Sequence, residues 1–188
     1  MLKAIAMAEK DKQQLQVAYF KHVLGYYYFT DKKEYVPALQ NMLQAHYAFT
    51  EFGYENVRDP EGMFDRLAFV YYHLNNFNET IRYLKGSLKY KSDNKRRHVS
   101  ILNTIGQSYR ELFQPDSAIK YFRISRQFAI RAKDTAWMGI TSGNIGHFHM
   151  SQKAYAQAKP FMLEYYRYGL IAKDSALVVE ALAGLADI

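Results

Sequence analysis

The sequence has no cysteine, few prolines and no long apolar run, and each of these absences excludes a class of protein. Without cysteine, the 188 residues can form neither a disulfide framework nor a thiolate metal site. Four prolines and ten glycines argue against a chain rich in β-strands or flexible linkers. No stretch approaches the roughly 18 apolar residues of a transmembrane helix, and residues 1–10 lack the apolar core of a signal peptide. The remaining class is a globular chain, whose 49% of apolar residues suffice for a substantial core.

Positive charge is in excess but is not concentrated. The formal net charge of +7 is mild for this length, and most lysines and arginines are spread along the chain. An acidic partner is therefore allowed, but nucleic acid is not required. The one dense basic cluster is Lys95, Arg96, Arg97 and His98, and the pattern favours a solvated turn and helix start there over a nucleic-acid contact. A nucleic-acid-binding helical repeat is kept as the alternative function.

Helical periodicity is what the sequence has in quantity, and residues 99–132 show it most fully. Apolar and small residues recur at the spacings of two amphipathic helices, first Leu102, Ile105, Gly106 and Tyr109, then Ala118, Phe122, Ser125 and Ala129. Pro115 separates the two helices, because a proline cannot continue the first helix but suits the first turn of the second.

The spacing Leu102-x-x-Ile105-Gly106-x-x-Tyr109, followed by Ala118-x-x-x-Phe122, resembles the tetratricopeptide repeat. This resemblance implies two antiparallel helices per repeat, with Gly106 and Ala118 at the closest approach of their backbones. It also implies that neighbouring pairs stack into a right-handed, all-α superhelix, in which the first helix of each repeat lines the concave side.

The same template fits most of the chain when it is shifted. A forward shift of 40 residues gives Ser142, Ile145, Gly146 and His149, and a backward shift of 38 gives Phe64, Leu67, Ala68 and Tyr71. Further back, Leu24, Gly25 and Tyr28 fit with one extra residue in the turn that follows. We therefore predict a single array over residues 1–188, with about four full helix pairs and a repeat cut at both ends. Helices are expected at 1–10, 13–29, 35–52, 61–74, 77–91, 135–150 and 154–172, besides the central pair within 99–132.

No constellation for catalysis, a metal or a cofactor emerges from the motifs. Gly139, Gly143 and Gly146 follow no strand and precede no Gly-Lys-Ser or Gly-Lys-Thr, so close helix packing accounts for them better than a phosphate loop. His147 and His149 point about 200° apart on a helix and cannot form one ligand set. His149 is expected in a packed position and His147 on the concave face. We expect neither an enzyme nor a cofactor in this segment.

The concave face is the remaining candidate site. The positions beside the packing stripes hold aromatic residues toward the N-terminus and hydrogen-bonding groups in the middle of the chain. The predicted groove residues are Tyr19, His22, Tyr26, Phe69, Tyr72, Asn103, Gln107, Arg110 and His147. We expect Tyr26, Phe69 and Tyr72 to be apolar anchors and Asn103, Gln107 and Arg110 to be orienting donors for a protein or peptide ligand. The alternative, that the rings pack against neighbouring repeats, stays open at this point.

The resemblance also bears on specificity and context. The family's carboxylate clamp uses Lys, Asn and Arg, whereas the equivalent places here hold His22, Tyr26, Arg66 and Ser100, so that specificity is not expected. Long-period arrays with Asn-x-Ile-Gly and tyrosine-rich helices are similar to those fused in bacteria to sensor histidine kinases or helix-turn-helix regulators. This similarity implies a sensory or regulatory segment of a longer protein, which would be cytoplasmic, or periplasmic if that protein is a membrane sensor. The sequence is compatible with a homo-oligomer and predicts no membrane contact by this segment.

Overall fold

The computed structural model describes residues 1–10, 13–90 and 94–188, and every regular element among them is a helix. This confirms the predicted all-α fold. The contacts within the chain divide it into two compact units, Met1–Lys91 and Ser92–Ile188. That residues 1–188 form one continuous array stays a prediction.

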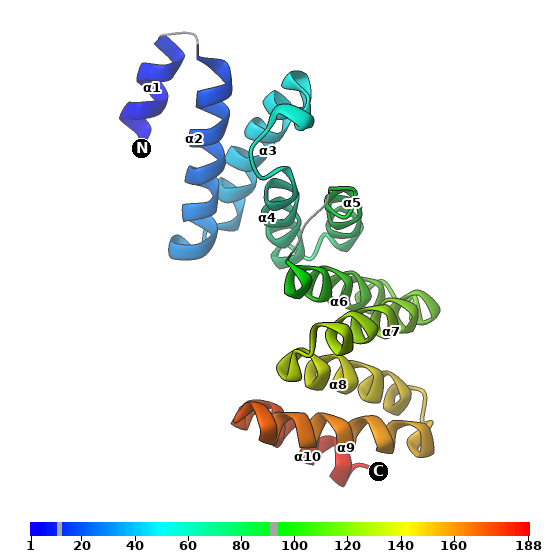
Figure 1. Ribbon diagram of the computed structural model, residues 1–188. Helices are drawn as coiled ribbons and strands as arrows, with labels where there is room; N and C mark the ends of the chain where they lie inside the picture. The colour runs from blue at the N-terminus through cyan, green and yellow to red at the C-terminus, as the bar shows by residue number, and fades with distance from the viewer. Residues whose placement is uncertain (11–12, 91–93) are drawn as a thin grey trace. The chain divides into compact units, whose positions relative to one another are not determined.

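The first unit consists of helix pairs with short connections. Its elements are α1 (Leu2–Lys10), α2 (Gln14–Tyr27), η1 (Tyr28–Lys32), α3 (Tyr35–Phe52), η2 (Tyr54–Asn56), α4 (Pro60–His73) and α5 (Phe77–Ser87). Helices α2 and α3 lie side by side, as do α4 and α5 (Figure 1). The core between α2, α3 and α4 is centred on Phe49, which is fully buried.

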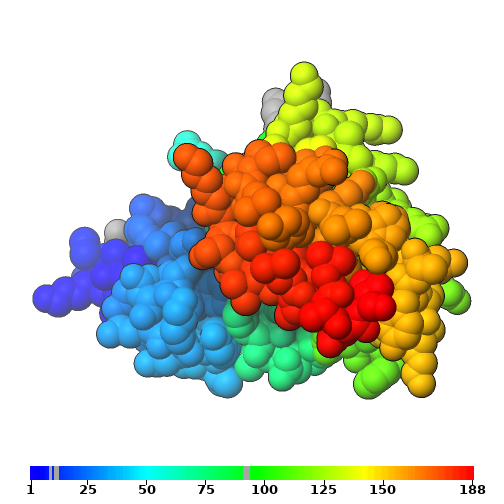
Figure 2. Space-filling model, turned by 90° about the horizontal axis from the view of Figure 1, so that it is seen from below, coloured from blue at the N-terminus to red at the C-terminus, as the bar shows by residue number. Residues whose placement is uncertain are grey.

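The second unit repeats the arrangement more regularly. Its helices are α6 (Lys95–Glu111), α7 (Pro115–Ala132), α8 (Thr135–Ser151), α9 (Tyr155–Ala172) and α10 (Ser175–Ala186). Consecutive helices pack against each other, and α9 and α10 lie together on the face shown in orange and red in Figure 2. Phe122 and Ile145 are buried between α7 and α8, and Met162 and Ala181 between α9 and α10.

The turn between the two helices of a pair recurs with one geometry. Asn75, Phe113 and Lys153 all adopt left-handed backbone angles, with φ of 57°, 56° and 57°. In each turn the next residue donates its backbone N–H to a carbonyl five residues earlier, at 2.9 Å, which closes the helix as a Schellman motif. The three positions are 38 and 40 residues apart, which confirms the period predicted from the sequence.

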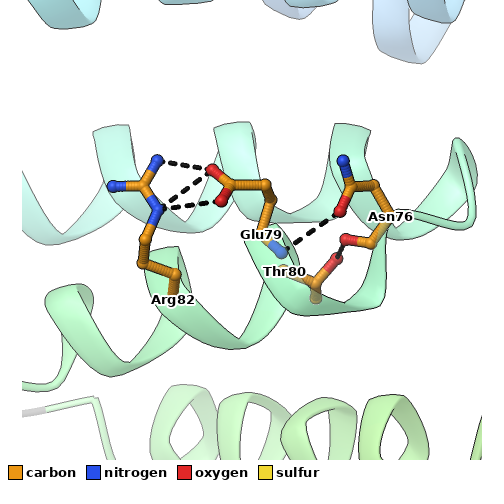
Figure 3. A network of polar contacts seen from close by, with 4 residues as sticks. All are labelled: Asn76, Glu79, Thr80 and Arg82. Atoms are coloured by element: carbon orange, nitrogen blue, oxygen red, sulfur yellow. Dashed lines mark hydrogen bonds and ion pairs between the residues drawn. The ribbon is translucent and has the colours of Figure 1, made fainter. Parts of the chain in front are cut away.

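The helix starts are capped as expected at the junctions between pairs. The side chain of Asp134 accepts a hydrogen bond from the backbone N–H of Trp137 at 3.1 Å, and that of Asp174 accepts from Ala176 at 3.0 Å. The equivalent Asp11 lies outside the described residues. At the start of α5, Asn76 accepts from the N–H of Glu79 at 3.3 Å, beside an ion pair of Glu79 with Arg82 (Figure 3).

In the first unit, one predicted detail is confirmed, the extra residue after Gly25, and one is wrong, the end of the helix that begins at Phe77. The extra residue after Gly25 is confirmed, because α2 ends in the π-helical turn η1, which takes up one more residue than an α-turn. The predicted helix at 77–91 is wrong from residue 88 to residue 90, and Lys91 lies outside the described residues. Helix α5 ends at Ser87, since Lys89 and Tyr90 donate to carbonyls only three residues earlier, which forms tight turns instead of α-helix.

Small residues allow the close contact within each pair. A Cβ atom on Gly106 would lie 2.6 Å from the ring of Phe122 and 3.3 Å from the carbonyl oxygen of Ala118, which confirms the predicted close approach. On α8, a Cβ atom at Gly143 would lie 2.7 Å from the ring of Tyr165, and one at Gly146 would overlap Met162 of α9. The glycines of α8 therefore serve helix packing.

A polar network joins the two helix pairs of the first unit. His22 of α2 is 4% exposed, and its Nε2 lies 3.4 Å from Nη1 of Arg66 on α4. The Nη2 of Arg66 lies 3.1 Å from the carboxylate of Asp59. Burial, and then the nearby Arg66 cation, lower the pKa of His22 to about 4, so the folded chain holds this ring neutral at pH 7.

We predict that the Gly25→Ala substitution destabilises the first unit. The added Cβ would lie 2.8 Å from the backbone oxygen of Ala38 and 2.7 Å from Cγ of Met42, so α2 and α3 would have to separate. We expect the free energy of unfolding to fall by about 1–3 kcal/mol. Urea unfolding measures this, and Gln40→Ala, at an exposed position of α3, should change it by less than about 0.5 kcal/mol. Wild-type stability in Gly25→Ala would contradict the close contact.

The lowered pKa of His22 predicts that the free energy of unfolding depends on pH. Between pH 6.5, where an exposed histidine ordinarily titrates, and about 4, the unfolded chain binds a proton at His22 that the folded chain does not bind. The free energy of unfolding therefore decreases as the pH falls through this window, by up to about 3 kcal/mol, and His22 adds no pH dependence above it. Urea unfolding of the His22→Gln variant at several pH values should show a shallower slope than the wild type. Equal slopes would exclude a depressed pKa.

Candidate functional site

Of the three predicted groove residues on α2, two are packed inside the first unit and one is exposed. Tyr19 belongs to the core, because its ring centroid lies 5.0 Å from that of Phe49 and its hydroxyl accepts a hydrogen bond from the backbone N–H of Arg58 at 2.7 Å. His22 lies in the buried network with Arg66. Tyr26 is 43% exposed, and the Arg66 guanidinium lies 5.3 Å from its ring centroid. Only Tyr26 of these three offers substantial surface to a ligand.

The predicted residues of α4 are partly covered by their own neighbours. Phe69 and Tyr72 are half-buried, and the ring of Tyr72 packs edge-on against Phe77 at a centroid distance of 5.7 Å. His73, next to it, stacks on Tyr35 at 5.0 Å. The alternative weighed from the sequence, packing of the rings within the array, thus describes several aromatic residues of the first unit. Their role in a groove stays a prediction.

In the second unit, α6 and α8 are joined by a pair of amides. The Nδ2 of Asn144 on α8 donates to Oδ1 of Asn103 on α6 at 2.7 Å, and Asn103 is 4% exposed. Within the part of the chain that the structure describes, neither amide makes a second side-chain hydrogen bond. Asn144 was missed from the sequence, because the shifted template aligns Asn103 with Gly143. The signal that could have found it is an asparagine one or two positions before the Ile-Gly pair in both helices.

Arg110 and His147, both predicted groove residues, line one cleft. The cleft has a volume of about 710 Å³ and lies between α6, α7, α8 and α10. Its wall also includes Phe113, Phe148 and Glu180, which sequence reasoning did not select. Gln107, one turn before Arg110 on α6, is half-buried and is not part of the lining. The structure therefore brings side chains of three consecutive repeats together at this place.

Two charged side chains of the cleft, Glu180 and Arg110, have polar partners close by. Glu180 accepts a hydrogen bond from the Tyr165 hydroxyl at 2.7 Å, and its other oxygen lies 3.2 Å from Nε2 of His147. Arg110 is paired with Glu111 at 3.0 Å. Burial, followed by the bond to Glu180, raises the pKa of Tyr165 well above its usual value. The phenol donates the hydrogen bond that holds this carboxylate in place.

Residues of the basic cluster at the start of α6 make contacts within the second unit. Asn94 caps the helix, which begins at Lys95, and this confirms the predicted helix start. The guanidinium of Arg96 lies 3.0 Å from the carboxylate of Asp134, and the ring of His98 stacks on Phe128 at 5.7 Å. His149 is buried as predicted and stacks on Phe161 at 5.9 Å.

The described residues provide neither a metal site nor a membrane span. Among residues 1–10, 13–90 and 94–188, no group of three or more His, Asp or Glu side chains is placed to hold a metal ion. None of the helices in these ranges combines the length and the apolar character that a membrane crossing requires.

A family model for the tetratricopeptide repeat matches residues 99–123, inside the stretch from which the repeat was inferred. None of the curated proteins compared with the sequence matches it.

Several solved structures share the arrangement of helices. The apo form of RapI matches with a TM-score of 0.79 and 18% identity, over 96% of this chain and 51% of that chain. The Rap conjugation gene regulator of plasmid pLS20, solved in complex with the Phr* peptide, matches with a TM-score of 0.64 and 17% identity, over 95% and 54%. A putative kinesin light chain of Podospora anserina with TPR-like repeats gives 0.73 and 10%, over 90% and 83%.

The chain thus spans about half the length of the two Rap proteins, with 51% and 54% of them covered. At identities of 18% or less, these similarities show a common fold. The chain therefore has an all-α, tetratricopeptide-like fold, and its residues 99–123 match the family's own model.

Proposed function

We propose that this chain is a module that binds a peptide or an extended protein segment, and that the inner helices α6, α8 and α10 of the second unit carry the main contact. The observation behind this proposal is the amide pair Asn103–Asn144 beside the cleft that Arg110 and His147 line. The proposal assigns no reaction to the chain.

The amide pair suits a peptide main chain. Besides the bond between the two side chains, Asn144 has a carbonyl oxygen and a second N–H, and Asn103 has its own NH₂ group. The pair therefore carries both donors and an acceptor at one place. A peptide group has one donor and one acceptor, which this arrangement can satisfy without regard to side chains. Side-chain selection would then come from the cleft.

The distances along α6 set the size of the ligand. Asn103 and Arg110 are two helical turns apart on the same face, which corresponds to about 10 Å at 1.5 Å per residue. An extended peptide covers this distance with about three residues. A segment of a few residues can therefore contact the amide pair and the cleft at the same time.

The similarity to the Rap regulator supports the proposal, because that protein was solved with a bound peptide. We further propose that the chain is the regulatory part of a longer protein, since it covers only about half of the Rap proteins. Fusion to a histidine kinase or a helix-turn-helix regulator stays a prediction, and reading the coding sequence on both sides of the segment would test it.

The peptide contact is testable with a random peptide library displayed on phage and selected on the purified chain. We expect selected peptides to bind, and we expect Asn144→Ala and Arg110→Ala each to weaken the binding about tenfold, because each removes a group that orients the ligand. Isothermal titration calorimetry measures this, with circular dichroism to verify the fold of each variant.

Asn78→Ala is the matched control, since Asn78 is an exposed asparagine on α5, in the other unit. It should leave affinity unchanged. Tyr72→Ala in the same titration tests the aromatic residues of the first unit. Failure to select any peptide, or unchanged affinity in both Asn144→Ala and Arg110→Ala, would show that the second unit does not hold the binding site.

A further inference from the structure

Phe113 occupies a position that the fold itself does not explain. It lies in the turn between α6 and α7, its side chain is 92% exposed, and its φ of 56° is in the left-handed region. Both properties are unfavourable for a phenylalanine, because a bulky side chain strains this backbone conformation and an exposed ring loses the benefit of burial.

The two equivalent turns show that the ring is not needed there. Asn75 and Lys153 have the same backbone angle and are followed by the same 2.9 Å backbone hydrogen bond, yet both are polar. Asparagine is among the residues that tolerate the left-handed region best. The turn would therefore form at least as well with asparagine in place of Phe113.

The place of the ring points to a ligand. Phe113 forms part of the wall of the 710 Å³ cleft, together with Phe148 and Pro115. In that wall Arg110 is paired with Glu111 and Glu180 accepts a hydrogen bond from Tyr165, whereas the buried Nε2 of His147 makes no hydrogen bond. Beside these polar groups the wall carries apolar surface, and the part of that surface that gains most from being covered is the ring of Phe113.

We infer that Phe113 is a ligand-contact residue, and that its ring and that of Phe148 hold a large apolar side chain of the bound peptide. This inference rests on the proposed peptide function and adds the specificity of the site. The apolar residue lies about four or five positions along the peptide from the residue whose main chain contacts Asn103 and Asn144, because Phe113 follows Asn103 by ten positions, or roughly 15 Å along the direction of α6.

The decisive variant is Phe113→Asn, which gives the turn a better residue and removes the ring. We expect the melting temperature to rise by about 2–4 °C and the affinity for a phage-selected peptide to fall by about tenfold or more. Phe113→Leu, which keeps an apolar side chain, should retain most of the affinity. Lys133→Asn, at another left-handed turn position with a φ of 54°, is the matched control and should leave affinity unchanged.

A second measurement identifies the chemistry of the contact. Peptides selected from the library should share one aromatic residue, leucine or methionine, and replacing it with alanine should weaken binding to the wild type but not to Phe113→Asn. Such coupling is expected only if the two side chains touch. Absence of coupling, or a lower melting temperature in Phe113→Asn, would overturn the inference.

The two proposals can fail separately. If Phe113→Asn keeps full affinity while Asn144→Ala loses it, the peptide function stands and Phe113 is not a contact residue. If neither variant changes affinity, or if no peptide is selected, the proposed site and the inference built on it are both wrong.

Discussion

Close contact between the two helices of each pair is the constraint on which the rest of this structure depends. A glycine on the first helix lets a large side chain of the second helix lie against its backbone, as Phe122 does at Gly106 and Met162 at Gly146. A glycine in a helix interior costs about 1 kcal/mol relative to alanine. The tighter packing offsets this cost, because it buries large apolar side chains completely.

The periodicity of the fold was predictable from the sequence because it rests on local rules. The stripes of small and apolar residues, the capping aspartates and the 38- and 40-residue period all follow from helix geometry and chain chemistry. Even the extra residue after Gly25 was visible as a shift in register, although the π-helical turn that absorbs it was not.

The site was harder to predict from the sequence than the fold, and the physical reason differs from residue to residue. Tyr19 has the spacing of a groove residue, but the irregular segment after α3 brings the N–H of Arg58 to its hydroxyl. No helical period describes such a segment. Phe113 lies in a turn, where hydropathy cannot distinguish an exposed ring from a core residue. Asn144 lies one register position away from its partner, so only coordinates could pair it with Asn103.

The packing constraint extends to the polar groups of the cleft. Gly143 has no side chain, and the ring of Tyr165 fills that space on α8, at 2.7 Å from where a Cβ would be. From this position the Tyr165 hydroxyl reaches Glu180 on α10 at 2.7 Å. A small residue that serves helix packing thus fixes a carboxylate in the wall of the proposed binding site. This carboxylate is therefore positioned before any ligand arrives, which reduces the conformational entropy that binding would otherwise have to remove.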